Sequence, residues 1–240
     1  MDKRVVIGAV LFSVLLALGY CFDLFTQAEV FVGSRVIDKY KYDGKEAFGI
    51  DVSSHQHTID WCKVRKWKGN DIKFVYCRAT GTQMPDRTYR YNFFEAKKNG
   101  LLVGSYHLFA PNVSAEIQFE KFIKVAKKEE QDLIPAVDLE LWGQISSRVY
   151  HKNLQRFLDM MEKHYGKKPL LYSVQGFYNS RLKKRYRPYH LWIARYNSKP
   201  PYLVDGAKWE IWQKSDREKI KGIVGNVDID IVRDLGHLIL

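Results

Sequence analysis

The chain has 240 residues, a length that suits one large domain or two small ones. Its residues are 46% hydrophobic and 14% aromatic, which excludes an intrinsically disordered chain. Lysine and arginine number 39 against 27 aspartates and glutamates, and the resulting charge of +12 favours an anionic partner. We find no nucleic-acid-binding motif, so nucleic acid is not the expected partner. Three cysteines are too few for a disulfide framework, and we expect Cys62 and Cys77 to be buried thiols.

The N-terminus has the pattern of a membrane anchor. Lys3 and Arg4 precede an apolar run from Val5 to Phe22. A run of about 18 residues reaches the lower limit for crossing a bilayer as a helix. The basic residues before it favour a cytoplasmic N-terminus and an exported domain, periplasmic or extracellular. We favour an uncleaved anchor over residues 1–22; the alternative is a signal peptide cut at Ala17-Leu18-Gly19, which would release a secreted protein.

Residues 23–46 show no sustained periodicity and are interpreted as a stalk. From residue 47 onwards, eight short runs rich in β-branched and aromatic residues have the composition of strands. These runs are Phe48–Val52, Ile72–Ala79, Leu101–Phe109, Leu133–Leu139, Pro169–Ser173, Leu191–Tyr196, Trp209–Gln213 and Val227–Val232.

Three helix-like segments separate the early runs, at residues 87–99, 114–130 and 146–165. Strands that alternate with helices predict a parallel sheet covered by helices, and eight such strands suggest a closed barrel. After the fifth run the helices shrink, and prolines punctuate the chain. We therefore expect residues 47–240 to form one α/β domain, a modified, irregular TIM-like β/α barrel of eight strands with reduced helices in its C-terminal part. Antiparallel strands are an open alternative for that part.

Acidic residues gather at the ends of the predicted strands. Asp51 ends the first run, Asp138 and Glu140 close the fourth, and Asp228 and Asp230 lie in the last. Alternate residues of a strand share a face, so Asp138 and Glu140 point the same way, and acids at C-terminal strand ends face the mouth of a β/α barrel. Two close carboxyls perturb each other so that one tends to keep a proton near neutrality. Glycoside cleavage needs such a pair, although strand-end acids also cap loops or pair with arginine.

The stretch from about Phe48 to Asp234 resembles the glycoside hydrolase family 25 lysozymes, the Chalaropsis-type N,O-diacetylmuramidases. Each matching segment is short and is by itself weak evidence for the family, whereas the whole set in the family's order is a specific signal. In chain order the segments are Gly49–Ser53 with Gln56, Phe74–Thr80, Gly104–Phe109, Pro135–Glu140, Pro169–Ser173, Leu191–Tyr196, Trp209–Gln213 and Val227-Asp228. Members of the family often carry Glu-Gly after Ala-Thr, whereas here Gly81-Thr82 follows Thr80.

The resemblance implies hydrolysis of the β-1,4 bond between N-acetylmuramic acid and N-acetylglucosamine in peptidoglycan, with no metal and no organic cofactor. By the family's pattern, Glu140 is the general acid. Asp138 assists at the anomeric side by positioning the acetamido group of the substrate. Asp51 and Asp228 line the mouth and orient or tune that pair. The candidate substrate-binding residues are Tyr106, Trp192, Arg78, Tyr172 and Gln213.

Three alternative functions differ from the muramidase interpretation in their chemistry or in their substrate. His55 and His57 form an H-x-H pattern found in metal-dependent barrel hydrolases, but His107 and His190 are poorly placed as further ligands. A non-catalytic wall-binding module could use the same fold, since fold does not guarantee activity. A glycosidase of another polysaccharide would show the same acids.

Overall fold

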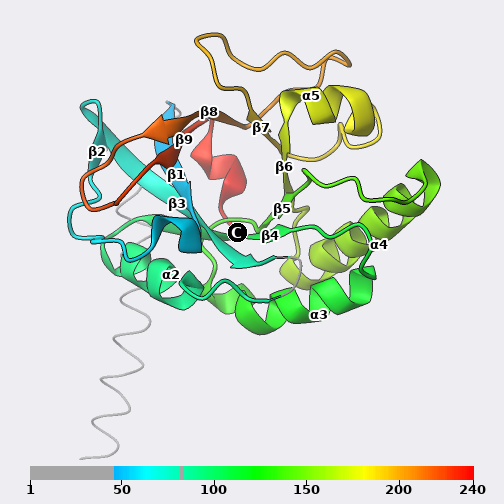
Figure 1. The fold of residues 1–240 in the computed structure, drawn as a ribbon, viewed down its shortest axis with the longest axis horizontal. Coiled ribbons are helices and arrows are strands. Elements are labelled where there is room, and N and C mark those ends of the chain that lie inside the picture. Colours follow the sequence, from blue (N-terminus) through cyan, green and yellow to red (C-terminus); the bar gives the residue numbers. More distant parts are fainter. Residues whose placement is uncertain (1–45, 82–83) are drawn as a thin grey trace, which may run out of the picture. The chain divides into compact units, whose positions relative to one another are not determined.

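The computed structural model describes residues 46–81 and 84–240, which belong to one compact unit (Figure 1). The predicted anchor over residues 1–22, and all but the last residue of the predicted stalk, lie outside the described residues. Across the described part of the chain, no helix has the length and apolar character needed to cross a membrane.

A closed barrel of eight strands forms the centre of the structure. Seven strands run parallel in the order β1, β3, β4, β5, β6, β7, β8, and β9 closes the ring by pairing antiparallel with both β8 and β1. The predicted closed barrel with an antiparallel C-terminal part is confirmed. The strands are β1 (Ala47–Val52), β3 (Asn70–Thr80), β4 (Leu102–Leu108), β5 (Ala136–Asp138), β6 (Leu170–Val174), β7 (Leu191–Ala194), β8 (Ile211–Glu218) and β9 (Val227–Val232).

One short strand was not predicted. β2 (Lys66–Trp67) pairs antiparallel with the first residues of β3 and forms a hairpin outside the ring. The predicted fourth run is also shorter than expected, because only Ala136–Asp138 of Leu133–Leu139 forms β5. The backbone N–H of Ile134 instead donates to the carbonyl of Leu238 in the C-terminal 3₁₀ turn η4 (Leu235–Leu238).

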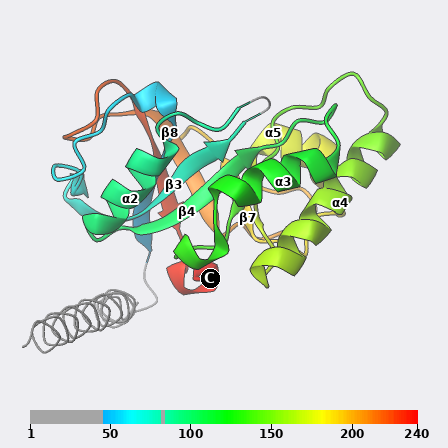
Figure 2. The same ribbon diagram turned by 90° about the horizontal axis from the view of Figure 1, so that it is seen from below.

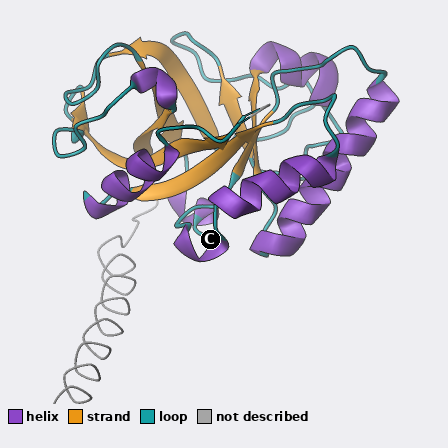
Figure 3. Cartoon of the chain, turned by 60° about the horizontal axis from the view of Figure 1, so that its bottom comes forward, coloured by secondary structure: helices purple, strands orange, loops and turns teal. Residues whose placement is uncertain are grey.

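The long helices lie along one side of the barrel, whereas loops cover the side of β8 and β9 (Figures 2 and 3). They are α2 (Tyr89–Lys98), α3 (Ala115–Val125) and α4 (Ser147–Tyr165). The side chains of Ser114 and Ser146 cap α3 and α4, and Gly166 ends α4 in the left-handed conformation. After β6 the helices are short, α5 (Gln175–Phe177) and a π turn, η3 (Tyr178–Leu182), as predicted.

The predicted helix over residues 114–130 is broken. α3 ends at Val125, and a separate 3₁₀ turn, η2 (Lys128–Glu130), follows. Ala126 has non-helical dihedral angles and is buried, and its carbonyl accepts the hydroxyl of Tyr165 in place of a helical N–H. A contact with α4 therefore overrides the local helical pattern.

Cys62 and Cys77 are both free thiols. Cys77 is buried in β3 as expected, but the expectation of burial was wrong for Cys62, which is exposed. Cys62 lies in a turn whose neighbours Trp61 and Val64 supply the core contacts, so its own side chain faces solvent.

Large aromatic rings fill the barrel because glycines face them. Tyr76 is fully buried in β3, and its hydroxyl donates to the carbonyl of Ile134 at 3.0 Å. Its ring lies 5.1 Å from that of Trp192 on β7. A Cβ at Gly104 of β4 would lie 2.4 Å from the Tyr76 ring, and a Cβ at Gly49 of β1 would lie 2.4 Å from the Phe74 ring.

We expect Gly104→Ala to destabilise the protein by about 1–3 kcal/mol, because the new methyl overpacks against a buried ring. Gly176→Ala is the control, since nothing lies within 4 Å of its added Cβ. We expect that control to change stability by less than about 1 kcal/mol. Urea denaturation of both variants tests this, and equal midpoints for Gly104→Ala and the wild type would contradict the packing described here.

Candidate active site

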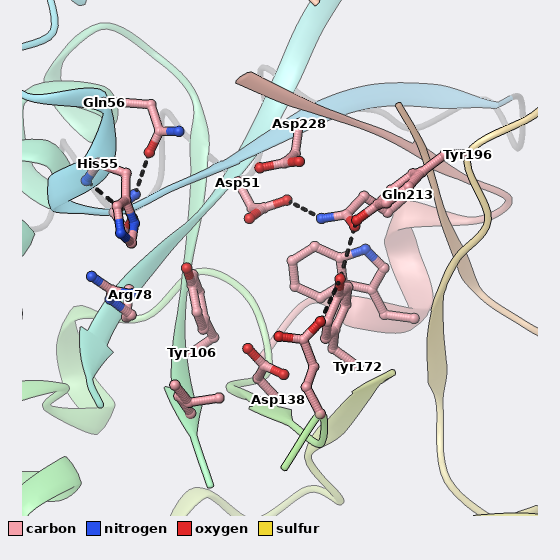
Figure 4. Close-up of a pocket in the computed structure, with 14 residues that line it drawn as sticks. Asp51, His55, Gln56, Arg78, Tyr106, Asp138, Tyr172, Tyr196, Gln213 and Asp228 are labelled. Atoms are coloured by element: carbon pink, nitrogen blue, oxygen red, sulfur yellow. Dashed lines mark hydrogen bonds between the residues drawn. The ribbon is translucent and has the colours of Figure 1, made fainter. Parts of the chain in front are cut away.

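A cavity of about 330 Å³ opens at the C-terminal ends of the parallel strands (Figure 4). All nine residues predicted from the sequence line it, so the structure brings them together although their individual roles stay predictions. They are Asp51, Arg78, Tyr106, Asp138, Glu140, Tyr172, Trp192, Gln213 and Asp228. The sequence reasoning missed five further lining residues: Ser53, His55, Gln56, Leu108 and Tyr196.

Asp138 and Glu140 share the mouth of this cavity. Asp138 is the last residue of β5, and Glu140 lies two residues further on, just beyond the end of the strand. The backbone N–H of Leu139 still bonds to the carbonyl of Tyr172, which continues the pairing with β6. Both acids therefore keep the alternation that turns them towards the cavity.

Burial, reinforced by the neighbouring Glu140, raises the pKa of Asp138 well above its usual range, and the Arg78 charge opposes this shift. Burial also raises the pKa of Glu140, and a hydrogen bond from the Tyr172 hydroxyl opposes it. The two carboxyls thus titrate as a pair that retains protons above the usual acid range. The Oδ1 atom of Asp138 is buried and has no hydrogen-bond partner among the described residues.

Gln213 on β8 connects three strands through its side-chain amide (Figure 4). Its Oε1 accepts hydrogen bonds from the hydroxyls of Tyr172 at 2.9 Å and Tyr196 at 2.8 Å. Its Nε2 donates to Oδ2 of Asp51 at 2.7 Å. The Tyr172 hydroxyl also approaches Oε1 of Glu140 at 3.5 Å, so a chain of polar contacts runs from Glu140 to Asp51.

Asp51 and Asp228 face each other across the antiparallel pair β1–β9. Burial raises the pKa of Asp228 to about 6, and the charge of Asp216 adds to the shift. Burial also raises the pKa of Asp51 well above its usual range, and the charges of Asp228 and Asp230 add to it. Both acids lie on the side of the cavity away from Asp138 (Figure 4).

Among the described residues, Arg78 is the only lysine or arginine that lines the cavity. Its guanidinium pairs with Asp86, at 2.9 Å from Nε and 2.8 Å from the second terminal nitrogen. The Asp86 side chain is fully buried and also accepts the backbone N–H groups of Ser54 and Thr88. Asp86 was not predicted, because it lies in the loop after β3 and belongs to no periodic run.

Trp192 and Tyr106 form the aromatic floor and wall of the cavity. Trp192 is only 2% exposed, and its Nε1 donates to Oδ1 of the buried Asp230 at 2.7 Å. Its ring meets the ring of Tyr106 edge-on at 6.5 Å and the ring of Tyr172 at 5.0 Å. Half-buried Tyr106 offers more surface to a ligand than Trp192 does.

Two of the missed residues had a usable signal. Tyr196 is 48% exposed and ends the sixth predicted run, so the strand-end argument that selected the acids applies equally to it. Gln56 lies in the first motif, and its side chain accepts the backbone N–H of Ser53 at 2.9 Å to complete a capping box. His55 lies in the same 3₁₀ turn, η1 (Ser54–Gln56), and bonds to Ser53; the sequence singled it out only as part of an H-x-H pattern.

The histidines considered as metal ligands are dispersed. His107 is buried between Thr80 and Gln118, bonding to them at 2.7 and 2.9 Å, and burial lowers its pKa to about 4. His55 is engaged with Ser53. Within residues 46–81 and 84–240, no group of three or more His, Cys, Asp or Glu side chains is arranged to hold a metal ion.

Comparisons with known proteins agree with this geometry. The family model described as "Glycosyl hydrolases family 25" matches residues 50–223. The structure of a family 25 glycosyl hydrolase from Bacillus anthracis superposes with a TM-score of 0.71 at 32% identity, covering 80% of this chain and 91% of that one.

Two curated relatives extend the comparison. The uncharacterized protein YegX of Escherichia coli K12 is 38% identical over 186 residues, which are 76% of this chain and 68% of that protein. The autolytic lysozyme of Clostridium acetobutylicum is 29% identical over 183 residues, 76% of this chain and 54% of that protein. The match of the family model over most of the barrel, together with these relatives, shows that the chain is a glycoside hydrolase and belongs to family 25.

Proposed function

We propose that this enzyme hydrolyses the β-1,4 bond between N-acetylmuramic acid and N-acetylglucosamine in peptidoglycan, with Glu140 as the general acid. The observation that carries the proposal is the pairing of Glu140 with buried Asp138 in one cavity, where burial raises the pKa of Glu140 so that it holds its proton to a higher pH than a free glutamate does. The similarity to an autolytic lysozyme supports the same bond.

Asp138 would act on the other side of the bond. Its Oδ1 is buried without a donor, and the N–H of a substrate acetamido group is a donor of the required kind. A hydrogen bond to the anionic form stabilises that form, so a bound acetamido group would favour ionised Asp138 and leave the shared proton on Glu140. The acetamido oxygen, oriented in this way, would then attack the anomeric carbon while Glu140 protonates the leaving oxygen.

The remaining lining residues would hold the sugar rings. Tyr106 and Tyr196 are the more exposed rings of the cavity, and aromatic faces suit sugar rings. Asp51 and Asp228 add negative charge to the cavity that holds the reacting pair, which favours a developing oxocarbenium ion. Arg78 offers a polar contact held in place by Asp86.

We expect Glu140→Gln to lower kcat on purified peptidoglycan by about a hundred- to ten-thousand-fold, because the amide cannot donate the proton. Glu120→Gln, at an exposed position on α3, is the matched control and retains wild-type activity. Release of reducing ends measures turnover, and mass spectrometry of the products identifies the bond. Binding to peptidoglycan with no turnover by the wild type would indicate a wall-binding module instead. Products ending in N-acetylglucosamine would exclude the muramidase specificity.

We expect Tyr172→Phe to raise the pKa of Glu140 further, because the hydroxyl that opposes the shift is removed. Glu140 must be protonated to act, so activity is lost as pH rises through its pKa, and this variant should stay active to higher pH. The ¹³C NMR titration of the glutamate carboxyls measures the shift, with Glu140→Gln identifying the signal. Tyr196→Phe removes a hydroxyl that bonds to Gln213 and Tyr172 but is not among the groups that shift the pKa of Glu140, so it should leave that pKa unchanged. An equal shift of the Glu140 pKa in both variants would contradict a specific effect of the Tyr172 hydroxyl on Glu140.

We also propose that residues 1–22 hold the domain on the outer side of a membrane, within reach of the wall. Lys3, Arg4 and the apolar run to Phe22 support this orientation, and the charge of +12 suits an acidic polymer. In fractionated cells the full chain should remain with membranes after an alkaline wash and be released by detergent. A shorter, soluble form whose sequence begins after Gly19 would indicate a cleaved signal peptide instead.

A further inference from the structure

We propose that Asp230, which lies beneath the catalytic cavity, shares one proton with Asp51 and is the positioning residue for Asp51 and Trp192. The effect on activity rests on the proposed function, whereas the carboxyl pair itself does not. Asp230 is absent from the lining of the cavity, and none of the roles described above uses its ionisable group.

The register of the barrel places the two carboxyls in successive layers. In the β1–β9 pair, Asp51 lies opposite Asp228 and Gly49 lies opposite Asp230. Alternate residues share a face, so Asp51, Asp228 and Asp230 all point into the barrel. Asp230 is fully buried, whereas Asp51 keeps 8% of its surface at the cavity. Gly49 contributes no side chain at the deeper layer, where the carboxyl of Asp230 comes within hydrogen-bonding reach of Asp51 while its Oδ2 atom has no donor among the described residues.

Trp192 and Gln213 each donate one hydrogen bond to the carboxyls of Asp230 and Asp51. Trp192 Nε1 can only donate, so Oδ1 of Asp230 is an acceptor at 2.7 Å. Oε1 of Gln213 accepts two tyrosine hydroxyls, which orients the amide so that its Nε2 donates to Oδ2 of Asp51. Oδ2 of Asp230 is buried with no donor from the described residues. A hydrogen bond between the carboxyls of Asp51 and Asp230 therefore requires that one of them carries a proton.

The charges around the pair lead to the same conclusion. Asp230 interacts with the carboxyl of Asp228 on β9 and with the hydroxyl of Tyr76 on β3. Asp51 interacts with Asp228, with Asp138 on β5, and with the ionisable side chains of Cys77, Tyr106, Tyr172 and Tyr196. β7 and β8 contribute Trp192 and Gln213, which carry no charge. Among the described residues, no ion pair reaches Asp51 or Asp230. Two buried carboxyls in contact without a cation do not both ionise, and burial followed by the charge of Asp228 raises the pKa of each.

The shared proton has two structural consequences. It leaves one negative charge on the pair at neutral pH, and it gives Asp51 a second fixed hydrogen bond beside that from Gln213. Asp230 also fixes the indole of Trp192, which forms the floor of the cavity. One buried side chain thus orients an acid and an aromatic ring that both face the substrate.

The test compares Asp230→Asn, whose amide accepts from Trp192 and donates to Asp51, with Asp230→Leu, which can do neither. Asp159→Asn removes an exposed acid on α4 and is the matched control. Thermal unfolding is followed from pH 5 to pH 9. In the folded wild type, the Asp51–Asp230 pair keeps a proton that the same carboxyls release in the unfolded chain above about pH 4. The free energy of unfolding of the wild type therefore falls as pH rises.

Asp230→Asn lacks the proton that the wild-type pair holds, so the difference between its Tm and the wild-type Tm should increase steadily as pH rises. For Asp159→Asn, the difference from the wild-type Tm should stay constant with pH. A purely steric role for Asp230 predicts a constant difference, and an ionised Asp230 predicts no gain at high pH. Either result would overturn the shared proton.

Activity on peptidoglycan tests the positioning role. We expect Asp230→Asn to keep kcat within about threefold of the wild type, and Asp230→Leu to lose about tenfold or more with KM less affected. Equal kcat for the two variants would overturn that role. If Asp230→Leu does not fold, loss of more than about tenfold in kcat by Asp230→Asn overturns it instead. An inactive wild type would refute the proposed function, while the unfolding series would still decide whether the proton is shared.

Discussion

The pairing of β9 between β8 and β1 is the contact on which the site depends. This strand runs antiparallel to both neighbours and closes the barrel, so no sheet edge is left unpaired in the ring. The same register sets Asp228 beside Asp51 at the rim and Asp230 one layer below. Barrel closure and the clustering of acids therefore have one cause, and a shift of register by one residue would turn these acids out of the barrel.

The clustered acids oppose folding near neutral pH, because burial raises the pKa of Asp51, Asp138 and Asp230 well above the values they have in an unfolded chain. Such an arrangement is typical of functional sites rather than of sites selected for stability alone. Gln213 provides hydrogen bonds here without adding positive charge. A cation in its place would pair with the acids and lower their proton affinity, which would remove the protonated state that acid catalysis requires.

The parts of the structure that follow local rules were predictable from the sequence. Asp51, Asp138 and Glu140 end runs with strand composition, and strand ends meet at one face of a parallel barrel. The parts that depend on distant contacts were not predictable. Asp86 reaches Arg78 from an irregular loop, and the end of α3 is set by a hydroxyl on α4. No pattern within a single segment encodes either contact.

The different roles proposed for Asp138 and Glu140 illustrate the same limit, because two acids two residues apart look equivalent in the sequence. Their surroundings distinguish them. Burial, reinforced by the charge of Glu140, keeps the pKa of Asp138 raised although the charge of Arg78 opposes the shift. Asp138 also retains a buried oxygen without a donor, whereas Oε1 of Glu140 lies 3.5 Å from the Tyr172 hydroxyl. A substrate N–H would thus stabilise the anion at Asp138 more than at Glu140. Binding itself would then settle which acid carries the proton, and the enzyme would reach its reactive charge state only with substrate in place.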